Sequence, residues 1–314
     1  MADRVRPSPA DRLKTYPLRS RPSKVTTAQF ARPTRSGDAV RRFLANLPDI
    51  LAARDLRGLI AAMKSARRKK KPLLWGLGAH VIKTGLSPVL IDLMTSGWIS
   101  GIAMNGAGIV HDFELAFAGR TSEDVAAEIG SGRFGMARET GEILNEAILS
   151  GAREGLGLGE SVGRMIARSD FPHRRRSLLG EAWRLGVPVT VHVAIGTDIL
   201  HLHPGASGEA TGKASLRDFR LFCGLVEKLD GGGVFLNVGS AVILPEVFLK
   251  AVSLVRNVRP RLDGFTTAVF DFQKLYRPAE NVARRPVGKK GTGYYFVGHH
   301  EIMIPLLAAA LSGR

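Results

Sequence analysis

Residues 73–80 have the sequence LLWGLGAH, and residues 234–240 have the sequence VFLNVGS. Each stretch is a short, mostly apolar run that reaches a glycine followed by a small or polar residue. Such runs are typical of strands that are buried on both faces of a parallel sheet. The two stretches therefore favour an α/β fold in which helices cover both sides of a central sheet.

The same strand pattern recurs at four other places, and helical periodicity separates them. We expect further strands at residues 99–105, 187–195, 264–270 and 294–297. We expect helices at residues 83–97, 122–128, 137–150, 160–168, 173–185, 215–229, 244–256 and 301–312. This alternation predicts a Rossmann-like, doubly wound α/β fold with a mainly parallel sheet and helices on both faces.

The chain divides into three predicted parts. Residues 1–37 are rich in proline and arginine and predict a basic tail, either draped on the surface or acting as a docking arm. Residues 38–72 carry apolar residues at helical spacing and predict an N-terminal helical segment. Residues 73–314 form the predicted Rossmann-like domain, in which residues 119–180 are a mostly helical insertion over one sheet edge.

The composition is that of a globular protein with a strong excess of positive charge. Lys and Arg number 45 and Asp and Glu number 28, so the formal net charge is +17. The shares of hydrophobic residues, 45%, and charged residues, 23%, exclude a wholly disordered or collagen-like chain. The excess favours an anionic partner. The densest run, residues 67–71, is interpreted as a solvated helix end, with nucleic-acid contact as the alternative.

Cysteine content and hydropathy exclude other classes. The single cysteine, Cys223, makes no internal disulfide and no CxxC metal site, and its apolar surroundings predict a buried structural thiol. No run approaches about 18 apolar residues, so we expect no membrane-spanning helix. Without an apolar leader at the N-terminus, the expected compartment is the cytoplasm.

The residues that follow the predicted strands point to a ligand site. In a doubly wound sheet, ligands bind outside the carboxyl ends of the strands. Nearly every predicted strand is followed by a glycine or small residue beside a polar one, and glycine lets the backbone approach a ligand closely. Repetition along one sheet edge predicts an extended ligand of about dinucleotide size. The positions are Gly78–His80, Asn105–Gly108, Gly196–Asp198, Gly239–Ser240 and Gly298–Glu301.

Three other patterns are weighed and set aside. His192, His201 and His203 would suggest a metal site, but alternating histidines need a third ligand and a second shell, so we expect no metal. Residues 130–135 match GxGxxG by letter but follow a helical segment rather than a strand. Residues 208–214 resemble a phosphate-binding loop, but the glycine spacing is one residue short.

At the predicted sheet edge the sequence resembles deoxyhypusine synthase, the family that transfers the aminobutyl group of spermidine to a protein lysine using NAD. The match spans about residues 70–312. The stretches that carry it are Gly78–Gly85, Asn105–Asp112, Thr197-Asp198, Thr267-Ala268, Arg277–Val282 and Pro305–Leu307.

The resemblance implies a Rossmann-like homotetramer that uses NAD and has active sites at dimer interfaces. His111 and His299 replace acidic residues, which makes NADP the alternative cofactor. The resemblance also implies that Asp271 and Glu280 bind a cationic substrate. By the same resemblance, the cofactor contacts are His80, Asn105, Gly106, Ala107, His111, Asp198, Gly239, Thr267, Ala268 and His299.

One departure from the family pattern concerns the reaction itself. Pro286 stands where the family has the lysine that captures the imine as a Schiff base, and Arg284 stands at a tryptophan position. Lys289 and Lys290 are the candidate catalytic replacements, provided that the loop is rearranged. The added arginines oppose a polycation, so we do not expect spermidine itself as the substrate.

Three hypotheses follow. The first is an NAD(P)-dependent transferase that moves an aminoalkyl group from a polyamine-like donor to an amine acceptor, which is a protein lysine or a small amine. The alternative is a dinucleotide-binding protein of the same fold without transferase activity. The third, a nucleic-acid-binding protein, is disfavoured because no recognised nucleic-acid-binding motif is present.

Overall fold

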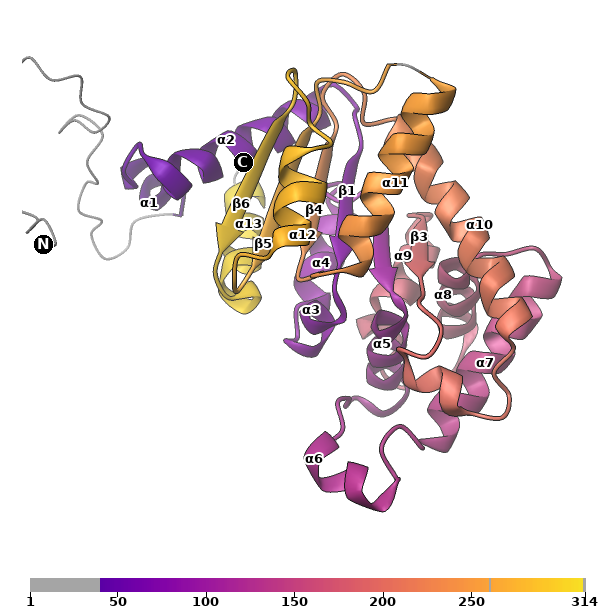
Figure 1. Cartoon of the computed structure of the whole chain (residues 1–314). Helices are drawn as coiled ribbons and strands as arrows, with labels where there is room; N and C mark the ends of the chain where they lie inside the picture. Colours follow the sequence, from indigo (N-terminus) through magenta and orange to yellow (C-terminus); the bar gives the residue numbers. More distant parts are fainter. Residues whose placement is uncertain (1–39, 260, 313–314) are drawn as a thin grey trace, which may run out of the picture.

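The computed structural model describes residues 40–259 and 261–312 (Figure 1). Its centre is a six-stranded parallel sheet in the order β3-β2-β1-β4-β5-β6. That order is the one expected of two βαβαβ halves wound in opposite directions, and it confirms the predicted fold class. The strands are β1 (Leu73–Leu77), β2 (Gly101–Asn105), β3 (Val189–His192), β4 (Val234–Val238), β5 (Thr266–Asp271) and β6 (Thr292–Val297).

Thirteen α-helices in the described residues surround the sheet. Short 3₁₀ turns at Ile129–Ser131, Arg174–Arg176 and Ile199–Leu202, and a π-helix at Ala279–Arg284, complete the secondary structure. The α-helices are α1 (Val40–Asn46), α2 (Leu51–Arg68), α3 (Ala79–Lys83), α4 (Ser87–Thr95), α5 (Gly106–Ala118), α6 (Val125–Glu128), α7 (Arg138–Arg153), α8 (Leu158–Arg168), α9 (Leu178–Leu185), α10 (Gly208–Glu227), α11 (Ile243–Val258), α12 (Tyr276–Pro278) and α13 (His300–Ser312).

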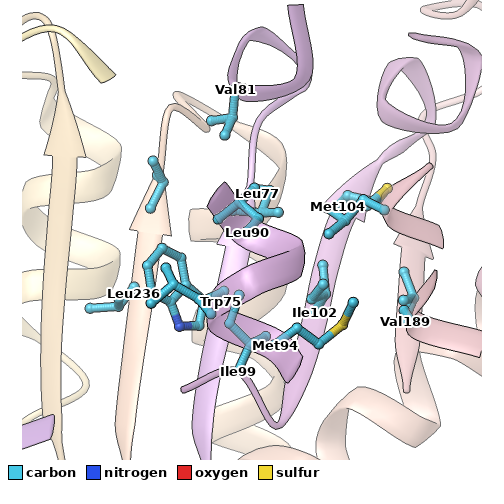
Figure 2. Packing of buried hydrophobic residues seen from close by; sticks show 14 of the residues in the cluster. Trp75, Leu77, Val81, Leu90, Met94, Ile99, Ile102, Met104, Val189 and Leu236 are labelled. Carbon is cyan, nitrogen blue, oxygen red and sulfur yellow. The ribbon is translucent and has the colours of Figure 1, made fainter. Parts of the chain in front are cut away.

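One face of the sheet carries the larger core. Side chains alternate between the two faces of a strand, so Trp75 and Leu77 of β1 share this face. They pack with Leu90 and Met94 of α4 (Figure 2). The Trp75 indole N–H donates to the carbonyl oxygen of Trp98 at 3.1 Å, so the polar atom of this buried ring is satisfied. Helix α2 adds Leu59 and Met63 to the same core.

The opposite face packs against α10 and α11. Phe235 of β4 stacks on Phe248 of α11 with ring centroids 4.0 Å apart, and Phe222 of α10 meets Phe235 edge-on. Cys223 lies in this cluster, where burial raises the pKa of its thiol to about 11. The prediction of a buried thiol is therefore confirmed.

Two buried aspartates tie the helical insertion to the sheet. Asp112 of α5 accepts hydrogen bonds from the backbone N–H groups of Leu178 and Leu179, which begin α9. Asp218 of α10 accepts from Gly159 N at the start of α8 and from Val191 N in β3. Each carboxylate supplies the acceptors that the first turn of a helix lacks. Burial raises the pKa of Asp112 to about 6 and that of Asp218 to about 7.

Helix α5 and the π-helix are two of the helical elements that the sequence patterns do not predict. The sequence pattern predicts no helix over residues 106–118, yet α5 forms there and buries Ile109, Val110 and Phe113. The π-helix at Ala279–Arg284 was not predicted either. The two glycine-containing patterns that were set aside do not form nucleotide-binding loops after strands: residues 130–135 follow α6, and residues 208–214 form the first turns of α10.

The described residues contain no helix long and apolar enough to cross a membrane. The predicted basic tail, residues 1–37, lies outside the described residues.

Candidate functional site

A pocket of about 210 Å³ opens at the carboxyl ends of β2 and β3. Helix α5 begins directly after β2, and the segment 197–199 follows β3 across the pocket from it. Three of the residues predicted to contact a cofactor meet here, namely Ala107, His111 and Asp198. The lining residues are Lys83, Ala107, Val110, His111, Glu114, Ser122, Glu123, Val125, Phe134, Thr197, Asp198 and Ile199.

The Asp198 carboxylate is seated against the start of α5. It accepts a hydrogen bond from the backbone N–H of Ala107, and a Cβ on Gly106 would lie 2.0 Å from its Oδ2. A capping box with His201 fixes Asp198 on its own side of the pocket. Burial raises the pKa of Asp198 above its usual range. Because this carboxylate already complements the α5 dipole, the start of α5 is not open to a phosphate.

His111 is a neutral imidazole at pH 7. Burial, with a smaller effect from Lys83, lowers the pKa of His111 to about 4. Its Nδ1 lies 2.7 Å from the Thr121 hydroxyl, which donates its only proton to Glu114. Thr121 therefore accepts from Nδ1–H, which leaves His111 Nε2 unprotonated. The pocket thus contains an imidazole nitrogen able to accept a proton or a hydrogen bond.

Two buried amide oxygens near the same edge have no hydrogen-bond partner among the described residues. They are Oδ1 of Asn105, the last residue of β2, and Oδ1 of Asn237 in β4. Gly76 of β1 pairs with both Ala103 and Asn237, so Asn105, two residues after Ala103, projects to the same face of the sheet as Asn237. Buried acceptors of this kind call for a donor from water or a ligand.

The crevice between β1 and β4, the expected switch point, is closed by backbone. A Cβ on Gly78 would lie 2.0 Å from the carbonyl oxygen of Gly239, and one on Gly239 would lie 2.9 Å from the His300 ring. His300 is buried, with Nε2 at 3.2 Å from the Phe270 carbonyl, and it packs with His80 and Phe272. The open pocket is consequently displaced from the switch point toward β2 and β3.

The histidine buried after β6, at the carboxyl edge of the sheet, is His300, whereas the sequence predicted His299 as the cofactor contact there. His299 is exposed and pairs with Glu301 at 3.8 Å. The signal for His300 was present, since it falls on the same face of α13 as Ile304, Leu307 and Leu311, all of which are buried.

Thr267 and Ala268 lie away from this edge. They are the second and third residues of β5, and both are fully buried. The Thr267 hydroxyl donates to the carbonyl of Val282 in the π-helix at 2.9 Å. Thr267 therefore lies beneath the π-helix, Ala268 lies in the larger core on the other face of the sheet, and neither lines the pocket.

The two predicted substrate carboxylates are in different surroundings. Asp271 ends β5 at the carboxyl edge and is buried. Glu280 lies in the π-helix and pairs with Arg284 and Arg285, and the Arg284 guanidinium lowers its pKa. The negative charge of Glu280 is thus already compensated by Arg284 and Arg285.

Lys289 and Lys290 lie at the opposite end of the sheet from the pocket. They precede β6, whose six residues span about 20 Å, so they stand at the amino edge. Lys290 pairs with Asp263, which precedes β5 at that edge. The structure does not bring either lysine near Ala107, His111 or Asp198, because in a parallel sheet a residue before a strand cannot reach the edge where that strand ends.

The three histidines considered for a metal have separate partners. His192 Nε2 lies 3.1 Å from the Thr190 hydroxyl, His201 Nδ1 accepts from Gly196 N, and His203 Nε2 lies 2.9 Å from the Gly135 carbonyl. Within residues 40–259 and 261–312, no group of three or more His, Cys, Asp or Glu side chains is placed to hold a metal ion.

The pH dependence of the unfolding free energy, compared between the parent and His192→Gln, tests whether His192 is buried as a neutral ring. Burial lowers the pKa of His192 from 6.5 to about 4, so between these values the unfolded chain binds the extra proton and stability rises with pH. The parent should therefore lose up to about 3 kcal/mol relative to His192→Gln as pH falls from 7 to 4. Urea unfolding of the parent and of His192→Gln measures this loss. The opposite contributions of Asp112 and Asp218 are the same in both proteins, so they cancel in the difference. A stability difference between the parent and His192→Gln that stays constant with pH would contradict the burial of His192 as a neutral ring.

Comparison with known proteins gives the fold. No protein family model matches the chain, and no curated protein matches it. Among solved structures, AgrE in a ternary complex with ornithine and NAD⁺ is similar, with a TM-score of 0.52, 16% identity, and coverage of 82% of this chain and 32% of that chain. A deoxyhypusine synthase assigned as putative, from Entamoeba histolytica, has a TM-score of 0.49 and 11% identity, covering 87% of this chain and 93% of that one. The chain spans about a third of the length of AgrE and of the cyanobacterial arginine dihydrolase ArgZ. At 16% identity, the similarity to AgrE shows a shared fold and nothing finer.

Proposed function

We propose that this chain binds an NAD-class dinucleotide at the carboxyl edge of its sheet, with the nicotinamide–ribose end in the pocket at Ala107, His111 and Asp198. The observation that carries the proposal is the pocket itself, which joins a neutral imidazole, a buried carboxyl group and a close backbone approach at Gly106. AgrE, which is similar in fold, has been crystallised with NAD⁺, and this supports a dinucleotide for the fold.

The residues fit one end of such a cofactor. Asn105 ends the strand that leads into α5, beside the pocket, and its partnerless Oδ1 calls for a donor, which a ribose hydroxyl or a carboxamide would supply. The 210 Å³ pocket is smaller than most small-molecule sites, so it suits a single nucleoside-sized group. A phosphate is not placed at α5, since the Asp198 carboxylate occupies that helix end.

The charge of the lining side chains favours an amine as the substrate, held at the mouth of the pocket beside the nicotinamide. Glu114 and Glu123 add carboxylates to that of Asp198, whereas Val110 and Phe134 are apolar. This combination suits a cationic group on a short aliphatic chain. When bound, the cofactor supplies a hydride acceptor. Unprotonated His111 Nε2 accepts a proton, and the carboxylates hold the amine.

The position of the lysines favours dinucleotide binding over aminoalkyl transfer. Lys289 and Lys290 lie at the amino edge, and Glu280 is paired with arginines, so neither part of the predicted transfer machinery supports aminoalkyl transfer in this pocket. The geometry therefore supports dinucleotide binding best, with transfer to a protein lysine or small amine as the second candidate. Lys83 at the pocket wall leaves NADP as the alternative cofactor.

Isothermal titration with NAD, NADH, NADP and NADPH tests the proposal. We expect the parent to bind one of them in the micromolar range. We expect Asp198→Asn and Ala107→Leu each to weaken binding about tenfold, by loss of a charged acceptor and by filling of the pocket. The control is Asp92→Asn, an exposed aspartate on α4. The proposal would be overturned if the parent bound none of the four nucleotides, or if both pocket variants bound as tightly as the parent.

A further inference from the structure

A second cavity, of about 680 Å³, lies at the amino edge of the sheet, opposite the pocket described above. It is formed where α2 ends, where β1 and β2 begin and where α10 ends. Its lining residues are Arg67, Lys69, Lys70, Lys71, Pro72, Leu73, Gly97, Ser100, Leu225 and Lys228. Five of these are cationic and none is acidic. We call this set the basic cavity.

The cations of the basic cavity are not neutralised by neighbouring carboxylates. No ion pair of the described residues includes any of the five. The acids near this edge are engaged elsewhere: Glu227 pairs with Arg259, and Asp263 pairs with Lys290. The Asp230 carboxylate accepts from Asp263 N. Positive charge is therefore left uncompensated at one concave place.

Two of the cations are held in position. The Arg67 guanidinium lies over the Trp98 ring at 4.3 Å, and the Lys71 ammonium donates to the Asp230 carbonyl at 2.5 Å. Fixing a long side chain before binding reduces the entropy that a ligand must overcome. The cavity is thus partly preorganised.

The backbone conformation of Lys70 is not explained by the attraction between cations and the helix dipole. Cations at the ends of α2 and α10 complement the helix dipoles, which explains basic residues there in general. But Lys70 has φ 53°, and Lys71 N bonds Ala66 O while Lys70 N bonds Arg67 O. This is the helix-ending motif whose left-handed position favours glycine. Glycine at position 70 would make the folded chain more stable, but the lysine at this position adds a positive charge to the cavity.

We propose that the basic cavity is a binding site for a compact anion that bears two or more phosphate groups. Its volume lies in the range of small-molecule sites. The described residues that line it include no aromatic ring, and the nearby Trp98 is buried beneath Arg67, so they offer no platform on which the bases of a single strand could stack. The site is separate from the proposed cofactor pocket and does not depend on it.

Titration of the full chain with sodium tripolyphosphate tests this site. We expect Lys70→Gly to weaken binding about tenfold while raising the unfolding temperature, because it removes a phosphate contact and relieves the left-handed lysine. Lys228→Gln should weaken binding by a similar factor. The matched control is Lys213→Gln, near the other end of α10 and about 22 Å away along the helix.

Four results would overturn the proposal. The first is no binding of tripolyphosphate by the parent. The second is an equal loss of affinity in Lys213→Gln, which would indicate a diffuse effect of the net charge. The third is preferential binding of a short RNA duplex that tripolyphosphate does not displace, which would assign the cavity to nucleic acid. A rise in stability of Lys70→Gly with unchanged affinity would likewise reduce Lys70 to a structural residue and contradict the site.

Discussion

Gly78→Ala should lose about 3 kcal/mol of unfolding free energy, measured by urea unfolding followed by circular dichroism. A Cβ at this position would lie 2.0 Å from the Gly239 carbonyl oxygen and 2.5 Å from its carbon. Both atoms belong to backbone, and Gly239 is fixed by its N–H bond to Phe270 O. The two turns that close the sheet at the switch point must therefore separate.

The control for Gly78→Ala is Gly212→Ala. Gly212 lies inside α10, and its Cβ would meet nothing within 4 Å. The same substitution there should stabilise the chain by about 1 kcal/mol, because alanine favours helix. If Gly78→Ala were as stable as the parent, the turns after β1 and β4 could not be in contact.

Asp112→Ala should lose about 3 to 4 kcal/mol. Its carboxylate accepts from Leu178 N at 2.7 Å and from Leu179 N at 3.0 Å, and it also accepts from the Ser177 hydroxyl. Alanine leaves these buried donors without partners in the first turn of α9. Asp112→Asn, which retains one amide oxygen as acceptor, should lose less.

Urea unfolding of Asp92→Ala gives the matched control for Asp112→Ala. Asp92 is exposed on α4, so its replacement should change the unfolding free energy by no more than about 0.5 kcal/mol. Equal stability of Asp112→Ala and Asp92→Ala would show that Asp112 does not hold α9 to α5.

The sheet could be predicted from the sequence because its signal is local. All six strands lie within the predicted ranges or overlap them closely, since parallel strands buried on both faces are continuous apolar runs. The edge on which ligand residues gather also follows from strand direction alone. Ala107, His111 and Asp198 meet there as expected.

Helix α5 could not be predicted from local pattern because its start depends on a distant residue. Gly106 and Gly108 are poor helix formers, so the segment reads as a loop. The Asp198 carboxylate, which is distant in sequence, accepts from Ala107 N, and the buried face of α5 packs on the core. Tertiary contacts therefore outweigh local propensity.

The two candidate lysines are a different case. Lys289 and Lys290 follow Pro286, which stands at the family's lysine position, and they precede the predicted strand at 294–297. Strand direction places such residues at the amino edge, as the structure shows. The direction rule was available from the sequence and would have separated these lysines from the cofactor residues.

The most direct test of the cofactor site is amide hydrogen exchange of the full chain with and without saturating NAD. The account predicts slower exchange at residues 106–113, the start of α5, and at residues 196–201, and unchanged exchange at residues 67–71. Unchanged exchange at the carboxyl edge, or slowing confined to residues 67–71 and 225–228, would contradict the account.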